Sequence, residues 1–378
     1  MDTVSDAACH EVRCRCTLPL EFAARVAMTE PVPPERINTP ADWRADELRA
    51  DEWLHTLSPA DVADVEAAAK ALVARGADLG ALTADDFPLP RLAARLRAIL
   101  QRDVLDGRGF AVIRGLDPAR LTRAENAAAF LGIGAHLGAA RPQNAMGHLL
   151  GHVKNVGRSG NDPTARLYQT NERQTYHTDS ADVVALMCLQ PAKRGGRSNV
   201  VSSVAIYNAI RAQAPELART LFEPIETDRR GEEVQGERAY FTIPVFNWFE
   251  GHFAAIYQRQ YIESARRFEE VAPLTAKQRA ALDMLDSCAN DPAFHVEIDF
   301  HPGDIQLVNN HVLLHDRTAF EDWPEPARRR HLLRLWLAPQ AAQPLPPIFA
   351  ERFGSTTPGA RGGVSVPRAK WNVPLDAE

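Results

Sequence analysis

The sequence predicts a mainly β fold, a sandwich or a barrel, with helices added around it. Short runs typical of strands recur after Gly109, and turn-forming residues separate them. Such a series of short strands favours a sandwich or a barrel. The expected strands are 110–115, 152–156, 182–189, 199–203, 253–257, 296–300, 304–308 and 332–337.

Helices are expected mainly before this region. One should begin after a Ser58 cap, carry Pro59 in its first turn and end at Gly76. A second should run from about Leu89 to Leu105, with its apolar residues on one face. Further helices are expected at 122–137, 204–222 and 275–289, the second of them interrupted at Pro215.

The domain organisation expected from these signals is a single structural domain in three parts. Residues 1–108 should form an irregular arm and a helical cover, and residues 109–340 the β core with helical insertions. Residues 341–378 form an extension rich in Pro and Gly, which we expect to wrap the surface or to cover the mouth of the active site.

The composition is that of a globular protein, with 45% hydrophobic and 24% charged residues. A net charge of −6 predicts no binding to nucleic acid or to an anionic membrane. No apolar stretch is long enough for a transmembrane helix, and the first residues lack the pattern of a secretory signal. Cys188 and Cys288 lie in apolar surroundings typical of reduced thiols, so a cytoplasmic location is expected. The sequence gives no indication of the oligomeric state.

Two distant segments carry the residues of a candidate metal site. His177 and Asp179 are two positions apart, so on a strand both would point to the same face. The second segment, 310–317, contains His311 and His315, four positions apart, and either could be the third ligand. Two imidazoles and one carboxylate are the protein ligands of mononuclear non-heme iron(II), and they leave one octahedral face open for substrate and oxygen. The segments therefore predict an oxygenase.

A cation in an apolar strand provides a second candidate site. Strand alternation places Arg334 and Trp336 on one face and leucines on the other, so both faces should be buried. A buried arginine requires an anionic partner, and its guanidinium can grip a small dicarboxylate cosubstrate in bidentate fashion. Ser198, after the turn at Gly195 and Gly196, could donate a second hydrogen bond to the same carboxylate.

Taken together, these segments resemble the taurine dioxygenase/TfdA-like branch of iron(II)- and 2-oxoglutarate-dependent oxygenases, which share their fold with clavaminate synthase. The resemblance covers roughly residues 109 to 340, and the motifs occur in the family's order. The matching motifs are His177-Thr178-Asp179, 191–198, Pro302-Gly303-Asp304, 310–320 and 330–334.

The resemblance implies a double-stranded β-helix, or jelly-roll, core with flanking helices and an N-terminal helical cover. It also implies that His177, Asp179 and His315 bind iron(II). Arg334 would bind the distal carboxylate of 2-oxoglutarate with help from Ser198, and Arg330 is a weaker candidate for that role. His311 then has a structural role.

The reaction implied couples the decarboxylation of 2-oxoglutarate by O2 to oxidation of a second substrate, with release of succinate and carbon dioxide. Related halogenases lack the carboxylate ligand, so Asp179 indicates hydroxylation or desaturation. The family suggests a small molecule such as an amino acid or a natural-product intermediate. Candidate residues for its pocket are Phe246, Trp248, Tyr257 and Arg317.

Two other functions use the same residues. A zinc-dependent hydrolase could bind its metal with the same ligands and activate a water molecule, but it has no use for an arginine that anchors an acid. A non-catalytic jelly-roll protein could bind 2-oxoglutarate as a sensor, although the presence of all three metal ligands argues against it.

Overall fold

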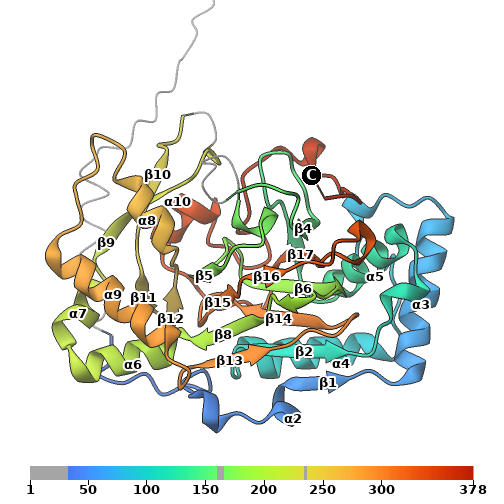
Figure 1. The fold of residues 1–378 in the computed structure, drawn as a ribbon, viewed down its shortest axis with the longest axis horizontal. Helices are drawn as coiled ribbons and strands as arrows, with labels where there is room; N and C mark the ends of the chain where they lie inside the picture. The colour runs from blue at the N-terminus through green and yellow to red at the C-terminus, as the bar shows by residue number, and fades with distance from the viewer. Residues whose placement is uncertain (1–32, 160–165, 234–235, 378) are drawn as a thin grey trace, which may run out of the picture. The chain divides into compact units, whose positions relative to one another are not determined.

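Two β-sheets that pack face to face form the centre of the computed structural model (Figure 1). The structure describes residues 33–159, 166–233 and 236–377. All described residues belong to one compact unit that begins at Pro33. The larger part of the irregular arm expected at the N-terminus therefore lies outside the described residues.

The larger sheet has seven strands, and neighbours in it are mostly distant in the sequence. All its pairs are antiparallel except that of its first two strands. In spatial order the strands are β1 (Leu54–Thr56), β2 (Phe110–Arg114), β14 (Ile305–Asn309), β6 (Val183–Gln190), β17 (His331–Ala338) and β3 (Ala139–Arg141), and β4 (Gly151–Val153) also pairs with β17.

The smaller sheet has four antiparallel strands and faces the larger one. A hydrogen bond of 2.9 Å joins Ser198 of this sheet to Gln306 of the other, so the two inner faces are in contact. Its strands are β13 (His295–Ile298), β8 (Ser198–Ser202), β15 (Leu313–Arg317) and β5 (Gln174–His177). This arrangement confirms the jelly-roll core with flanking helices.

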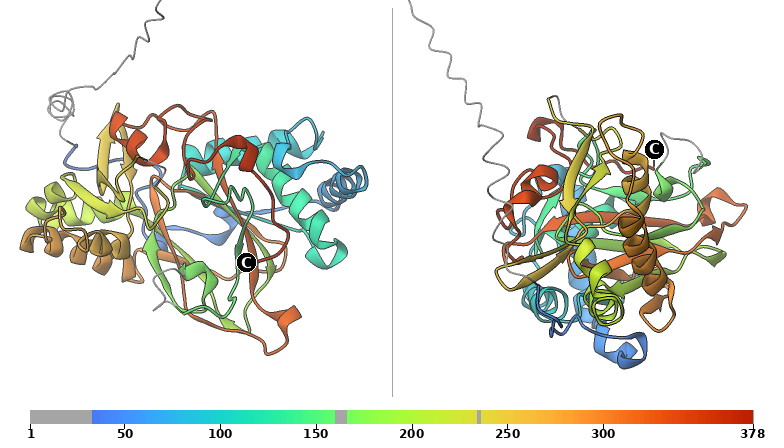
Figure 2. Two further views of the ribbon diagram at one scale, coloured as in Figure 1. Left: turned by 90° about the horizontal axis from the view of Figure 1, so that it is seen from above. Right: turned by 90° about the vertical axis from the view of Figure 1, so that its left-hand side faces the viewer.

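Helices cover both ends of the core (Figure 2). The helices at 59–74, 92–99 and 123–135 pack on the outer face of the larger sheet. Their leucines join those of β17 in one apolar cluster. Among the described residues no helix is both long and apolar enough to span a bilayer. The helices are α2 (Ala50–Trp53), α3 (Pro59–Ala74), α4 (Leu92–Ile99), α5 (Arg123–Ala135), α6 (Ser203–Gln213), α7 (Pro215–Thr220), α8 (Arg259–Ala265), α9 (Ala276–Asn290) and α10 (Ala350–Phe353).

The helix at 59–74 begins and ends where its capping residues predicted. The Ser58 hydroxyl accepts the backbone N–H of Asp61 at 3.1 Å, and the Asp61 carboxylate accepts that of Ser58 at 3.0 Å. Gly76 follows α3 with φ of 65°, a conformation that favours glycine. The predicted helix 89–105 is divided, because α4 ends at Ile99 and a π-helical segment, Leu100–Leu105, continues it.

The structure differs from the prediction between residues 223 and 265. This stretch adds α8 and two hairpins, β9 (Pro224–Asp228) with β10 (Tyr240–Pro244) and β11 (Phe246–Phe249) with β12 (His252–Ala255). A third short pair is β7 (Arg194–Gly195) with β16 (Phe320–Glu321). The expected strand 253–257 corresponds to β12, whereas β9, β10 and β11 were not expected from the sequence.

The turn Pro302-Gly303-Asp304, one of the recognised motifs, has a structural role. Gly303 has φ of 86°, and a Cβ there would lie 1.9 Å from the carbonyl oxygen of Leu116, so only glycine fits. Asp304 is fully buried and forms a bidentate ion pair with Arg114 of β2, with both N–O distances 2.7 Å. The turn thereby fixes β14 beside β2.

Replacing Asp304 with Asn should lower the free energy of unfolding by about 3–5 kcal/mol, because it leaves the Arg114 guanidinium without its counter-charge. Urea denaturation followed by circular dichroism measures this change. The control is Lys193→Gln, which breaks the exposed ion pair with Glu321 and should cost less than about 1 kcal/mol. Equal losses in the two variants would contradict the role given to Asp304.

Candidate metal centre

The candidate metal ligands meet where β5 and β15 pair. His177 is the last residue of β5 and lies opposite His315 in the middle of β15, with ring centroids 4.2 Å apart. One ligand atom from each of His177, Asp179 and His315 lies within 4.8 Å of the others. His177 and Asp179 were expected to point to the same face of one strand. Instead, Asp179 lies beyond the end of β5, and His315 is central in its strand.

Asn310 holds the backbone around Asp179. Its side-chain oxygen accepts the backbone N–H of Asp179 at 2.9 Å, and its amide donates to the carbonyl oxygens of Asp179 and Ala181. These hydrogen bonds hold the backbone beyond His177, where the pairing of β5 with β15 ends. It places the Asp179 carboxylate between the two sheets.

Both histidines present a nitrogen lone pair to the centre. The Nδ1 of His177 lies 2.8 Å from the carbonyl oxygen of Thr175, which can only accept, so Nδ1 carries the proton and Nε2 is available as a ligand. The amide of Gln174 donates to this Nε2 at 2.9 Å. The Nε2 of His315 is buried and has no hydrogen-bond partner in the described part of the chain. Burial lowers the pKa of both imidazoles, that of His315 to about 3, which keeps both neutral.

The Asp179 carboxylate is ionised and held from the larger sheet. Burial alone would raise its pKa, but Arg334 and the two histidines outweigh this effect and the pKa is lowered. Its Oδ2 accepts from the indole Nε1 of Trp336 at 2.9 Å and from Nη1 of Arg334 at 3.2 Å. Two neutral imidazoles and one carboxylate, with a buried nitrogen left unpartnered, fit an iron(II) ion.

Arg334 is buried on the inner face of β17, as the alternation predicted. Its Nε donates to the side-chain oxygen of Gln143 at 2.7 Å, and the amide of Gln143 donates back to the Arg334 carbonyl at 2.8 Å. Its guanidinium lies 5.1 Å from the ring centroid of Tyr168 and 5.0 Å from that of Trp336. The anion that forms an ion pair with Arg334 is therefore the carboxylate of Asp179.

A small internal cavity beside the metal centre contains two further buried arginines. Arg330 donates from Nη2 to the Gly196 carbonyl at 3.2 Å, while its Nη1 has no partner among the described residues. Arg317 likewise leaves Nε and Nη1 unpartnered within the described ranges. Burial lowers the pKa of Arg330 to about 10 and that of Arg317 to about 9. Ser198 also lines this cavity.

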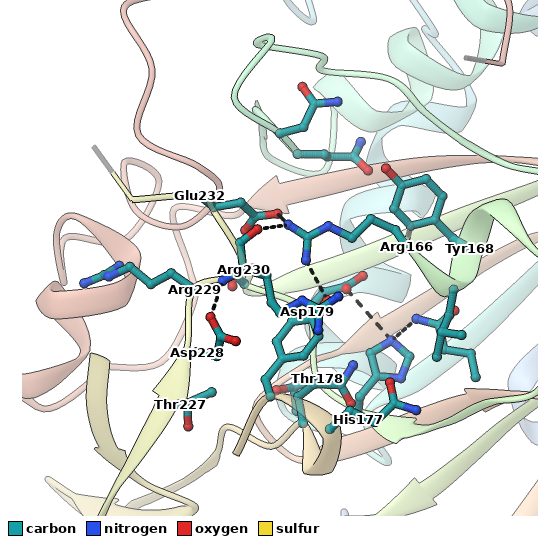
Figure 3. A pocket seen from close by; sticks show the side chains of 18 of the residues that line it. Arg166, Tyr168, His177, Thr178, Asp179, Thr227, Asp228, Arg229, Arg230 and Glu232 are labelled. Atoms are coloured by element: carbon teal, nitrogen blue, oxygen red, sulfur yellow. Dashed lines mark hydrogen bonds and ion pairs between the residues drawn. The ribbon is translucent and has the colours of Figure 1, made fainter. Parts of the chain in front are cut away.

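A larger pocket of about 640 Å³ opens on the other side of the ligands (Figure 3). Of the pocket residues expected from the sequence, Tyr257 lines this pocket and Arg317 the small cavity. The expectation for Phe246 and Trp248 was wrong, because both pack in the core around α6 and α9. Besides Arg334, this pocket is lined by arginines that the sequence did not indicate, which are Arg166, Arg173, Arg229, Arg230 and Arg352.

His311 lies away from the metal centre. Its Nε2 is 2.7 Å from Oδ1 of Asp182, and the same oxygen accepts from Arg361 at 2.8 Å. His311 belongs to this buried network, so His315 is the histidine that joins His177 and Asp179.

Replacing Trp336 with Phe should weaken iron(II) binding by about 10- to 100-fold, because the Asp179 carboxylate loses the donor that orients it. Anaerobic metal titration measures the dissociation constant. Trp323→Phe, in the turn before β17, is the control. Unchanged metal affinity in the Trp336 variant would show that Arg334 and Asn310 suffice to position Asp179.

Comparison with known proteins agrees with this geometry. Residues 73–336 match the model of the taurine catabolism dioxygenase TauD, TfdA family. FR-33289 synthase of Streptomyces rubellomurinus is 33% identical over 82% of this chain and 93% of that protein. The taurine hydroxylase-like protein SAT17 of Stachybotrys chartarum is 32% identical over 79% of each chain.

A solved structure shares the fold. The non-heme iron oxygenase OrfP, in complex with Fe, succinate and (3S)-hydroxy-L-Arg, superimposes with a TM-score of 0.58 over 75% of this chain and 94% of that one. The two sequences are 18% identical.

Proposed function

We propose, given that the chain belongs to the TauD/TfdA family, that it hydroxylates a small polar molecule at an iron(II) ion held by His177, Asp179 and His315. The chain is an iron(II)- and 2-oxoglutarate-dependent dioxygenase, as the family match and the oxygenase fold indicate. The observation that carries the residue assignment is the donor set itself. It consists of two neutral imidazoles and one ionised carboxylate, with the ligand nitrogen of His315 buried and unpartnered in the described structure.

When bound, iron(II) with 2-oxoglutarate and O2 supplies the oxidant that removes hydrogen from a C–H bond. The protein's own groups position and shield this chemistry. Thr175 keeps the proton of His177 on Nδ1, and Trp336 with Arg334 fixes the direction of the Asp179 carboxylate. The two sheets exclude water from the inner side of the site.

Arg330, rather than Arg334, is the better candidate for the distal carboxylate of 2-oxoglutarate, and Ser198 would join it by turning its hydroxyl away from Gln306, to which it donates. Arg334 already has a carboxylate partner in Asp179, whereas Nη1 of Arg330 has none in the described ranges. A buried guanidinium without a counter-charge costs several kcal/mol, which an incoming carboxylate would offset. Arg317, the second incompletely paired cation of this cavity, adds to the attraction.

The positions of the two cavities support this assignment. His177, Asp179, Gln174 and Arg334 line both, so a cosubstrate that reaches from the metal into the small cavity leaves the larger pocket for the second substrate. That pocket is within the size range of small-molecule sites. The hydroxylated arginine in the OrfP structure supports an amino acid or a similar small molecule as the substrate class.

Incubation with iron(II), 2-oxoglutarate and oxygen should yield succinate, and the yield should rise when a panel of amino acids and small acids includes a substrate. Succinate is measured by chromatography, with His177→Ala as the control. Absence of succinate above this control would contradict the oxygenase, and tightly bound zinc with hydrolytic turnover would favour the zinc hydrolase.

Arg330→Gln should raise the dissociation constant of 2-oxoglutarate by about 10- to 100-fold, because a charged hydrogen bond to a carboxylate contributes about 1.5–3 kcal/mol. Anaerobic titration of the iron-loaded protein measures it through the visible charge-transfer band of the cosubstrate complex. Arg328→Gln, at an exposed position of the preceding turn, is the control. If Arg334→Gln weakens 2-oxoglutarate binding and Arg330→Gln does not, the original assignment to Arg334 holds instead.

A further inference from the structure

The C-terminal extension passes directly beside the chain that follows the candidate metal ligand Asp179. Its segment 361–364 is held there by the backbone N–H of Gly363, which donates to the carbonyl oxygen of Ser180 at 2.6 Å. Gly362 and Gly363 have φ of 84° and 76°, and a Cβ on Gly362 would lie 2.9 Å from the same carbonyl oxygen. Two consecutive glycines thus allow an approach to Ser180 that a side chain would obstruct.

Arg361 is completely buried and fixes this segment to the core. Its Nε donates to Oδ1 of Asp182 at 2.8 Å, while Nη1 and Nη2 donate to the carbonyl oxygens of Thr356 and Gln343 at 2.8 and 2.6 Å. Asp182 is also buried, and its Oδ1 lies 2.7 Å from Nε2 of His311. Separating this ion pair would leave a charge alone in the interior, which is strongly unfavourable.

Asp182 connects Arg361 with the residue that holds the metal ligand. Its carbonyl oxygen accepts the backbone N–H of Asn310 at 2.9 Å. The side-chain oxygen of Asn310 in turn accepts the backbone N–H of Asp179 at 2.9 Å. One ion pair and two hydrogen bonds therefore link the Arg361 guanidinium to the backbone of Asp179.

Packing provides a second connection between this segment and the metal ligand. Val364 is buried in one apolar cluster with Ala181, Val184 and Trp336. The indole Nε1 of Trp336 donates to Oδ2 of Asp179 at 2.9 Å. Because protein interiors are close-packed, a loss of volume at Val364 loosens the packing around this indole.

We propose that segment 361–364 is a positioning element of the metal centre. Arg361 holds the backbone of the Asp179 loop, and Val364 holds the indole that orients the Asp179 carboxylate. This inference rests on the proposed function, because it takes Asp179 as a ligand of iron(II). The segment lies outside residues 73–336, which match the family model, whereas the three proposed ligands lie within them. The C-terminal extension thus completes a site whose ligands come from the family core.

The test is an anaerobic titration of the full chain with iron(II) and then with 2-oxoglutarate. Arg361→Gln should weaken iron(II) binding about tenfold and shift the wavelength of the charge-transfer band, because the Asp179 carboxylate is no longer held in one direction. Arg361→Lys keeps a positive charge beside Asp182 and should retain most of the affinity. Arg368→Gln, at an exposed position of the same extension, is the control.

Val364→Ala tests the proposal without disturbing the buried ion pair. It should weaken iron(II) binding severalfold and shift the band in the same direction as Arg361→Gln. The matched control is Val65→Ala, which removes the same side-chain atoms from a fully buried site in α3. Urea denaturation should show similar losses of stability in the two valine variants, whereas only Val364→Ala should change iron(II) binding.

The outcomes separate the two proposals. Absence of the charge-transfer band in the unmodified chain contradicts the proposed function. If the unmodified chain forms the band, and Val364→Ala and every Arg361 variant that folds keep its iron(II) affinity and its wavelength, the positioning role is overturned. Equal weakening of iron(II) binding in Val65→Ala and Val364→Ala also overturns it, because the effect is then one of stability alone.

Discussion

The buried carboxylate of Asp179 is the group on which the arrangement of the site depends. It lies just beyond the end of β5, and its donors Arg334 and Trp336 come from β17 of the opposite sheet. A charge in this interior is tolerated only with a partner, so the pairing fixes how the two sheets face each other at the metal centre. The pairing of β5 with β15 places the two histidines opposite each other, and the carbonyl of Thr175 orients the ring of His177.

The buried arginines of the interior differ in whether they have a counter-charge. Arg334 has its counter-charge, whereas Arg330 and Arg317 have nitrogens without partners in the described structure. In the proposed function, the first orients Asp179 as a ligand of the metal, and the other two form the cavity that attracts the cosubstrate. The larger pocket lies on the opposite side of the metal centre. A cosubstrate and a substrate would thus approach one ion from separate cavities.

Local signals were sufficient for most of the fold. The Ser58 cap, Pro215 and the strand alternation of 332–337 each depend on residues close in sequence, and the elements formed where these signals indicated. Between residues 223 and 265 only β12 was expected, and β9, β10 and β11 were missed because their register is set by pairing with a partner strand. Phe246 was placed in the pocket for the same reason, since only the hairpin's orientation turns it into the core.

The sequence by itself determined the chemistry of the site: the ligand types, their order, the jelly-roll core, and the need of a buried arginine for an anion. Only the tertiary structure decided which anion each arginine meets. Arg334 and Asp179 are 155 positions apart, and Glu232 and Arg352 are 120 apart. No local pattern encodes such a pairing, because a charged group is neutralised by whatever the fold brings within a few ångströms. The tertiary structure therefore identifies Arg330 and Arg317 as cations left incompletely paired, within the described ranges, beside the candidate metal ligands.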